Sequence, residues 1–304
     1  MIQVFTHPAC LAHDTGPGHV ERPARLSTVL HALEAAFPNI DWQQAPRASR
    51  GQLLRVHAEE LLATVLESSP QGLIQLDPDT VLSPGSAEAA LRAAGAGVAA
   101  VDAVLGGGTC RAFCAVRPPG HHATSDAAMG FCLFNNIAIA ARHALDKHGL
   151  ERVAIVDFDV HHGNGTQAIF ASEPRVLFAS SHQWPLYPGS GAHNETGCGN
   201  VFNAPLPDGC SGEMFRDAWQ EGLLPAVDAF RPQLLLVSAG FDGHRRDPLA
   251  GMQLEAGDYA WITRALVQMA NRHCDGRVVS LLEGGYDLAA LADGCVAHID
   301  ALRL

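Results

Sequence analysis

The sequence predicts an α/β protein with a mainly parallel sheet that carries helices on both faces. Two observations lead to this class. Short apolar, β-branched runs recur along the 304 residues, and helical patterns separate most of them. Parallel strands are connected by helical crossovers and, being buried on both faces, are continuously apolar. No internal repeat, low-complexity tract or linker interrupts the pattern, so we expect one domain over residues 1–304.

The predicted elements alternate along the chain. Apolar runs predict strands at residues 2–5, 111–116, 153–158, 175–180, 234–239 and 277–282. Helical periodicity predicts helices at residues 23–36, 86–105, 136–147, 212–230, 255–271 and 287–302. Ser86 follows Pro84-Gly85, and we expect it to cap its helix. Residues 181–208 are rich in Gly, Pro and Asn and predict a long irregular loop, a kind of segment that is often functional.

Composition excludes several classes of protein. The formal charge of −12 argues against non-specific nucleic-acid binding, although an acidic surface would attract a basic substrate. The eight cysteines form no CxxC pair, so reduced, mostly buried thiols are expected. No signal peptide or run of about 18 apolar residues is evident, so we expect a cytoplasmic protein without a membrane partner.

Polar segments directly follow four of the predicted strands. They lie at residues 117–122, 157–165, 240–244 and 283–286. Open parallel sheets bind ligands beyond the carboxyl ends of their strands. If the four strands are adjacent, their polar segments share one rim of the sheet.

The segment from Asp157 to His161 is typical of a metal site. Residues two apart in an extended chain point to the same side, so Asp159 and His161 could reach one ion. Asp242 would complete three protein ligands and leave a position for water, the arrangement of catalytic zinc. Turn-capping acids and surface histidines are the alternative, but a second DxH segment, Asp242-Gly243-His244, favours the metal.

Two further features indicate chemistry beside such a metal. Tandem histidines, His121 and His122, have pKa values suited to general acid/base work near neutral pH, although they could also be ligands of a two-metal hydrolase. Tyr286 follows two glycines at a strand end and could donate a hydrogen bond to an oxyanion. A turn-packing aromatic is the alternative for this tyrosine.

Together these motifs resemble the histone deacetylase superfamily, specifically its class II-like branch with bacterial members. The matching segments are RPPGHH (117–122), GFCLFNN (130–136), DFDVHHGNGTQ (157–167), SAGFDGH (238–244), DPLAG (247–251) and EGGYDL (283–288), with HVERPARL (19–26) and LSPGS (82–86). The resemblance covers nearly the whole chain. It implies the three-layer α/β/α arginase/deacetylase fold, with a mainly parallel sheet of about eight strands, and zinc-dependent hydrolysis of an acyl-amide.

The resemblance also implies roles for single residues. Asp159, His161 and Asp242 match the zinc ligands, and His122 matches the general base and acid. Asp157 would orient His121, while Asn164 would contact His122; the Asn at this position and Gly-Phe-Asp at 240–242 place the chain nearer class II. Tyr286 matches the residue that stabilises the transition state. Some class II members have His there and are poor deacetylases, so Tyr predicts activity.

The resemblance further implies a substrate channel and a second ion. Phe131 and Tyr187 would form the walls of an acyl-lysine channel, although Tyr187 replaces the more usual Phe. Gly130 and Gly284 would lie beside the chain's path. A structural monovalent cation, K⁺ or Na⁺, would be held by the residues at the corresponding positions, which are Asp157, Asp159, His161, Ser180 and Ser181.

The substrate is the more open question. Leu249 falls at the channel rim, where polyamine-selective relatives carry Glu, so acylated lysine in a protein or peptide is favoured over a small acylated amine such as an acetylpolyamine. Asp79 is a candidate for holding the substrate backbone, with a solvated loop acid as the alternative. A two-metal ureohydrolase and a catalytically silent acyl-lysine-binding protein are the competing classes, and a homo-oligomer is possible.

Overall fold

A central sheet of eight strands forms the middle of the molecule in this computed structural model, which describes residues 2–68 and 70–304. Its order is β2-β1-β5-β10-β9-β6-β7-β8, and every neighbouring pair is parallel. The strands are β1 (Ile2–Thr6), β2 (Asp41–Gln44), β5 (Arg111–Cys114), β6 (Val153–Asp157), β7 (Val176–Gln183), β8 (Val201–Leu206), β9 (Leu234–Ala239) and β10 (Val278–Leu282). A separate antiparallel pair joins β3 (Ile74–Gln75) to β4 (Val81–Leu82).

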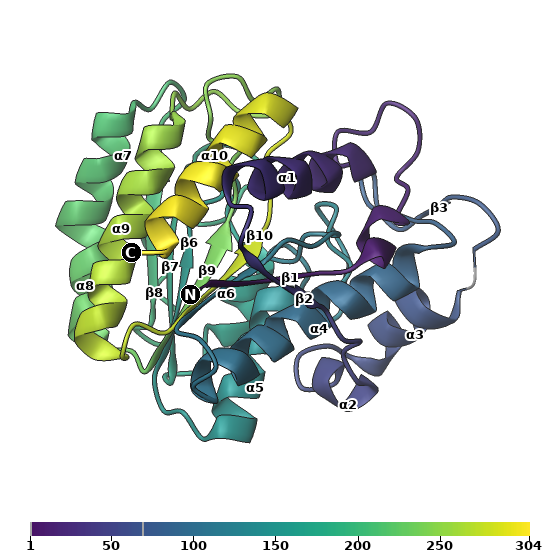
Figure 1. Ribbon diagram of the computed structural model, residues 1–304, viewed down its shortest axis with the longest axis horizontal. Coiled ribbons are helices and arrows are strands. Elements are labelled where there is room, and N and C mark those ends of the chain that lie inside the picture. The colour runs from purple at the N-terminus through teal and green to yellow at the C-terminus, as the bar shows by residue number, and fades with distance from the viewer. Residues whose placement is uncertain (1, 69) are drawn as a thin grey trace.

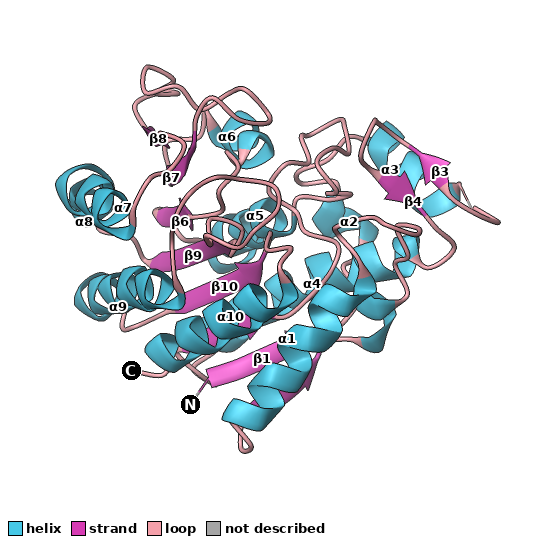
Figure 2. Cartoon of the chain, turned by 90° about the horizontal axis from the view of Figure 1, so that it is seen from above, coloured by secondary structure: helices cyan, strands magenta, loops and turns pink. Residues whose placement is uncertain are grey.

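Helices cover both faces of the sheet (Figures 1 and 2). One layer contains α1 (Pro23–Ala36), α9 (Ala256–His273) and α10 (Leu288–Leu302), and beside it run α7 (Gly212–Ala218), the π-helical turn η2 (Trp219–Leu223) and α8 (Leu224–Phe230). The opposite layer contains α4 (Ser86–Leu105), α5 (Asn136–His148) and α6 (Asn164–Phe170). Three short helices, η1 (Pro8–Leu11), α2 (Arg50–Leu53) and α3 (Glu59–Glu67), complete the fold. The predicted three-layer α/β class is confirmed.

The four strands that precede the polar segments are adjacent. They are β5, β10, β9 and β6, which occupy the middle of the sheet in that order. All of their residues are buried, as expected for strands covered by helices on both faces. Because parallel strands end at the same edge, the four polar segments share one rim, as the sequence predicts.

Local sequence explains the end points of the helices that flank this rim. Asn135 caps α5 by accepting a hydrogen bond from the Ala138 backbone N–H at 3.0 Å, and the helix ends at Gly149, whose left-handed φ of 68° favours glycine. Asp287 caps α10 in the same way through the Ala290 N–H at 2.8 Å. These caps place the starts of both helices at the rim, next to residues 120 and 286.

Some expectations about local structure are wrong. Residues 181–208 are not irregular throughout, because β7 continues to Gln183 and residues 201–206 form the edge strand β8. The polar edge strand β2 was not predicted either. Both strands lie at sheet edges, where one side lacks a neighbour and the apolar signal is weak; Pro205 is tolerated in such a position. Ser86 is the first residue of α4 rather than its cap, which is Gly85.

The cysteines and the hydrophobicity of the helices can be compared with the sequence-based expectations. All eight cysteines are free, and six of them are buried, as expected; Cys110 and Cys198 are exposed. Within the described ranges 2–68 and 70–304, none of the helices has the length and apolar character needed to cross a bilayer.

Candidate active site

Three buried ligand-type side chains converge at the rim of the sheet. Asp159 and His161 follow β6, and Asp242 follows β9, the strand beside it. Their candidate ligand atoms all lie within 4.8 Å of one another. The Nδ1 atom of His161 is 3.0 Å from Asp242 Oδ2 and 3.3 Å from Asp159 Oδ1. The sequence-predicted metal triad is therefore brought together in space.

The charge of this cluster suits a cation. Burial lowers the pKa of His161, but its contacts with Asp159 and Asp242 outweigh burial and raise the pKa to about 10. Positive charge is thus strongly stabilised between the two carboxylates. One imidazole nitrogen and two carboxylate oxygens are ligands that Zn²⁺ accepts, and three protein ligands leave room for water. The residues fit a catalytic divalent metal.

Glycines and backbone N–H groups hold the carboxylates in place. The Gly284 N–H donates to Asp159 Oδ2 at 2.8 Å, and the Val160 N–H donates to Asp242 Oδ1 at 2.9 Å. A Cβ atom at Gly284 would collide with the carboxylate of Asp242, and one at Gly240 would collide with that of Asp159. Glycine is therefore required at both positions by close approach.

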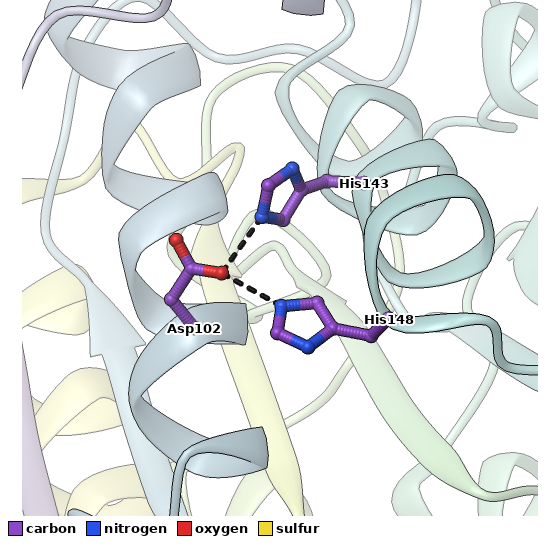
Figure 3. Close-up of side chains that lie close together, drawn as sticks. All are labelled: Asp102, His143 and His148. Carbon is purple, nitrogen blue, oxygen red and sulfur yellow. Dashed lines mark hydrogen bonds and ion pairs between the residues drawn. The ribbon is translucent and has the colours of Figure 1, made fainter.

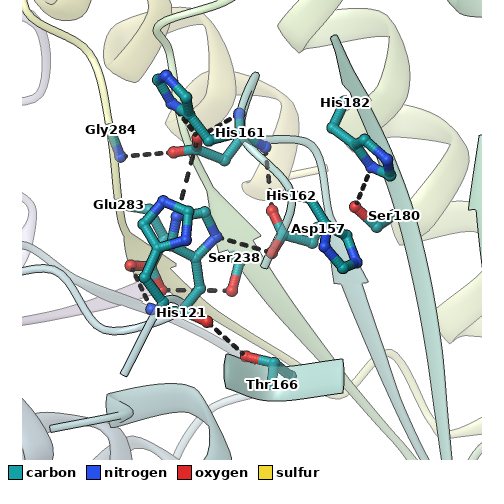
Figure 4. A network of polar contacts seen from close by, with 12 residues as sticks. His121, Asp157, His161, His162, Thr166, Ser180, His182, Ser238, Glu283 and Gly284 are labelled. Carbon is teal, nitrogen blue, oxygen red and sulfur yellow. Dashed lines mark hydrogen bonds and ion pairs between the residues drawn. The ribbon is translucent and has the colours of Figure 1, made fainter. Parts of the chain in front are cut away.

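The first of the tandem histidines is paired with a carboxylate (Figure 4). His121 Nδ1 lies 2.9 Å from Asp157 Oδ2. Burial lowers the pKa of His121, but Asp157 and Asp159 outweigh it and raise the pKa to about 10. Burial raises the pKa of Asp157 to about 6. His121 therefore carries a positive charge in this arrangement, and Asp157 fixes its ring.

The second histidine has the opposite character. His122 Nδ1 lies 2.8 Å from Asn164 Oδ1, an atom that only accepts hydrogen bonds, so Nδ1 carries the proton. Burial, together with the neighbouring His121 and His161, lowers the pKa of His122 well below its ordinary value. The Nε2 atom is then a neutral base. The two adjacent histidines thus differ in protonation because one faces a carboxylate and the other an amide.

Tyr286 follows β10 and lies beside Arg25. The Arg25 guanidinium carbon is 4.9 Å from the centroid of the tyrosine ring, and its Nε donates to the Gly285 carbonyl at 2.6 Å. Burial raises the pKa of Tyr286 well above its ordinary value. The phenol therefore keeps its proton and is available as a hydrogen-bond donor.

A cavity of about 240 Å³ opens onto these groups. Its lining combines His122, His161 and Tyr286 with five predicted channel residues, and the full set is Asp79, His122, Gly130, Phe131, His161, Leu186, Tyr187, Leu249 and Tyr286. Gly284 does not belong to the lining; it contacts the metal cluster instead. Leu186 was not predicted, because a single leucine beside Tyr187 has no distinctive signal.

Two neighbouring residues of the cavity lining have an unusual backbone conformation. Gly130 and Phe131 have φ angles of 56° and 68°, in the left-handed region. A Cβ atom at Gly130 would collide with the ring of His122. A bulky residue with positive φ is rare and occurs mainly at functional sites. Here it holds the Phe131 ring 5.8 Å from that of Tyr286.

Two of the residues expected to hold a monovalent cation, Asp157 and Ser180, lie side by side on neighbouring strands. Asp157 and Ser180 are partners in the β6–β7 register. The Ser180 hydroxyl is 2.9 Å from His182 Nδ1, and the Ser181 hydroxyl accepts a hydrogen bond from the Trp219 indole at 3.0 Å. Each hydroxyl thus has one hydrogen-bond partner in the protein, and its oxygen keeps a lone pair with which it could bind a cation.

Several site residues had no role assigned from sequence. Glu283 accepts hydrogen bonds from the backbone N–H groups of Gly120 at 2.7 Å and His121 at 3.2 Å, and so holds the tandem-histidine segment. Burial raises the pKa of Glu283 to about 7. Glu283 and Arg25 both stand inside recognisable motifs, but the Gly120 N–H and the Gly285 carbonyl that they respectively contact lie more than 150 residues away in the chain.

Comparison with known proteins agrees with this fold and shows the family of the chain. The model of the histone deacetylase domain matches residues 19–302. A probable deacetylase of Archaeoglobus fulgidus is 43% identical over 94% of this chain and 81% of its own length. The histone deacetylase-like amidohydrolase of Pseudomonas aeruginosa is 41% identical over 98% of this chain and 85% of its own. The crystal structure of the HDA15 HD domain superposes with a TM-score of 0.95 at 35% identity, covering 99% of this chain and 87% of that one.

These findings define the class of protein first: an α/β/α domain with the arginase/deacetylase fold. The chain belongs to the histone deacetylase family.

Proposed function

We propose that this chain is a zinc-dependent amidohydrolase that removes acyl groups from the ε-amine of lysine in proteins or peptides. One observation carries the proposal: His161 belongs both to the metal-type cluster and to the cavity that His122 and Tyr286 also line. A metal, a base and a hydrogen-bond donor can therefore act on the same amide group of a bound substrate.

Asp159, His161 and Asp242 would hold the zinc ion. When bound, zinc supplies Lewis-acid polarisation of the amide carbonyl and lowers the pKa of water. The two carboxylates neutralise the formal charge of the ion. The remaining steps depend on groups of the chain itself.

His122 moves the protons. Its Nδ1–H is held by Asn164, so its neutral Nε2 accepts a proton from water as the oxygen attacks the carbonyl carbon. When the C–N bond breaks, the same Nε2 returns that proton to the leaving amine. The charged His121 beside it disfavours a second positive charge, which promotes the return of the proton.

Tyr286 stabilises the developing oxyanion. Its raised pKa keeps the hydroxyl protonated, so it donates a hydrogen bond as negative charge builds on the substrate oxygen. A donor of this kind is typically worth about 3 kcal/mol in the transition state. The presence of Tyr at this position supports activity rather than silent binding of acyl-lysine.

The cavity lining favours an acyl-lysine substrate. Phe131 and Tyr187 line the cavity and can pack on both sides of a methylene chain, and Leu249 adds apolar surface. An ammonium-bearing polyamine would gain no carboxylate from Leu249. Acetylpolyamine hydrolysis is the second candidate because Asp79 supplies one acid to the lining.

A K⁺ or Na⁺ ion is proposed at Asp157, Asp159, His161, Ser180 and Ser181. The pKa of Asp157, raised to about 6 by burial, supports a cation that would offset the cost of ionising this carboxylate. The ion would supply structural support to the loop after β6.

The test is turnover of an acetyl-lysine peptide by His122→Ala and Tyr286→Phe. Each variant is expected to lose activity by about two to three orders of magnitude, because each lacks a group that acts in the transition state. Near-normal turnover in either variant contradicts the proposal.

Two matched substitutions control for nonspecific effects. Tyr259→Phe removes a buried hydroxyl that has no hydrogen-bond partner among the described residues, and His31→Ala removes an exposed imidazole on α1. Both variants should retain normal turnover.

A further inference from the structure

A second cluster of metal-ligand side chains joins α4 to α5 (Figure 3), and none of its three residues lines the catalytic cavity. Asp102 projects from α4, while His143 and His148 project from α5. The Nε2 atoms of His143 and His148 lie 2.8 and 2.7 Å from the same oxygen, Asp102 Oδ1. The candidate ligand atoms of the three residues lie within 4.8 Å of one another, as do those of Asp159, His161 and Asp242.

The two imidazoles approach this oxygen from different directions. Their rings are 5.4 Å apart between centroids, with an interplanar angle of 75°. Both Nε2 atoms therefore point at one place, as ligands of a single ion do. Asp102 and His148 are 52% and 25% exposed, so an ion and its waters can enter from solvent, while His143 anchors the buried side.

The donor set selects a class of ion. Two imidazole nitrogens beside one carboxylate oxygen suit Zn²⁺, Ni²⁺ and Cu²⁺ better than Mg²⁺ or Ca²⁺, which take oxygen ligands. The remaining coordination positions would be filled by water.

Helix geometry also favours positive charge here. Asp102 lies in the last turn of α4, which ends at Leu105, and His148 is the last residue of α5. The carbonyl ends of the two helices therefore meet at the cluster. Each end carries partial negative charge, which stabilises a cation within the last turn.

One neighbouring group opposes the ion. Arg55 Nη1 lies 3.3 Å from His143 Nδ1, where it donates to the unprotonated nitrogen. Coordination through Nε2 places the ring proton on Nδ1 and displaces this guanidinium. Arg55 is about one-third exposed, and its Nε atom also lies 3.9 Å from Asp146 Oδ2. The displaced guanidinium can therefore still pair with Asp146.

We propose that Asp102, His143 and His148 form a second divalent-metal site, which binds a Zn²⁺-like ion and fastens α4 to α5. The site is independent of the reaction at the cavity. Its measurable effects are an additional bound ion and a more stable helix pair.

The test is calorimetric titration of the zinc-loaded protein with further Zn²⁺, accompanied by melting curves. The wild-type chain is expected to bind one more ion than His148→Ala or Asp102→Asn, and added zinc should raise its Tm but not theirs. Both substituted positions are solvent-accessible, and melting without added metal verifies that the variants fold. Equal stoichiometry in all three proteins overturns the proposal.

The chain offers a matched control. Asp228 accepts the same kind of contact from His273 Nε2 at 2.8 Å, but Arg272 takes the place of the second histidine. His273→Ala should leave the zinc stoichiometry unchanged. Arg55→Gln removes the opposing charge and is expected to tighten binding about fivefold; weaker binding in this variant would contradict the assigned position of the ion.

Discussion

The carboxylate of Asp247 holds the backbone of Tyr286. Asp247 Oδ2 accepts a hydrogen bond from the Tyr286 N–H at 2.7 Å, and Oδ1 accepts one from the Leu249 N–H at 3.1 Å. One side chain thus ties the loop that carries the proposed oxyanion donor to the loop that carries the cavity-lining leucine.

Asp247→Asn is expected to lower kcat about tenfold with little change in KM. The amide group has one oxygen, so one of the two N–H groups would face a donor, and a lost hydrogen bond of about 1.4 kcal/mol corresponds to a tenfold change. Tyr286 acts mainly in the transition state, which places the loss in kcat. Steady-state kinetics with Asp293→Asn, an exposed acid, as control would check this. A raised KM at normal kcat would refute a positioning role.

Removal of the catalytic metal should abolish turnover. A strong chelator is expected to inactivate the protein, and added Zn²⁺ should restore it. Asp242→Asn should lower zinc affinity by at least about 100-fold, because even residues behind the ligands contribute 10- to 100-fold. Elemental analysis after dialysis measures the retained zinc, with Asp300→Asn on the exposed face of α10 as the control. Full zinc content in Asp242→Asn would remove this residue from the ligand set.

Buried Glu21 predicts a specific loss of stability in acid. Its carboxylate is bonded by Arg117 at 2.5 and 2.6 Å and by Arg25 at 3.0 Å. Burial raises the pKa of Glu21, but Arg117 and Arg25 outweigh it and lower the pKa from 4.5 to about 2. The lowered pKa means that the ionised form stabilises the fold above pH 4.5, and that this contribution disappears as the pH falls toward 2.

Glu21→Gln should therefore lower the free energy of unfolding by on the order of 3 kcal/mol at pH 7, and by less as the pH falls below 4.5. Denaturant titrations of both proteins between pH 7 and pH 3 measure this difference. Glu34→Gln changes an exposed residue of α1, and the free energy of unfolding of this variant should stay close to that of the wild type at every pH. If the difference in free energy of unfolding between the wild type and Glu21→Gln stays constant with pH, Glu21 is not ionised in the folded protein.

Leu249→Glu is expected to shift selectivity toward acetylpolyamines. The new carboxylate would line the cavity together with Asp79 and could pair with a substrate ammonium. A hydrogen bond to a charged group contributes about 1.5 kcal/mol or more, so the ratio of kcat/KM for acetylpolyamine over acetyl-lysine peptide should rise at least about tenfold. Leu249→Gln has a similar shape without charge and should change the ratio little. An equal shift in both variants would exclude the charge as its cause.

The sequence predicts the buried strands and the convergent polar residues well, for a physical reason. Strands β6, β9 and β10 are covered on both faces, so their apolar runs are uninterrupted, and the residues after them must share a rim. The sequence alone therefore predicts that Asp159, His161 and Asp242 lie close together.

Other features are invisible in the sequence because they depend on distant contacts. Edge strand β2 is mostly polar, and Asn203 and Pro205 interrupt the apolar run of edge strand β8, so neither has the continuous apolar sequence of the central strands. The contact of Arg25 with the Gly285 carbonyl spans 260 residues and has no local signature. The opposite protonation of His121 and His122 depends on Asp157, at the end of β6, and on Asn164, at the start of α6.

The place of β10 in the sheet has a consequence for biosynthesis. This strand is the last of the chain, yet it lies between β5 and β9 in the middle of the sheet. Until β10 emerges from the ribosome, β5 can pair only with β1 and β9 only with β6, and the strand that joins these two halves of the sheet is missing. The sheet closes only after residues 278–282 have left the exit tunnel, and pairings this distant in sequence form slowly. Premature termination near residue 277 would therefore remove the centre of the sheet, and with it the rim that carries Tyr286.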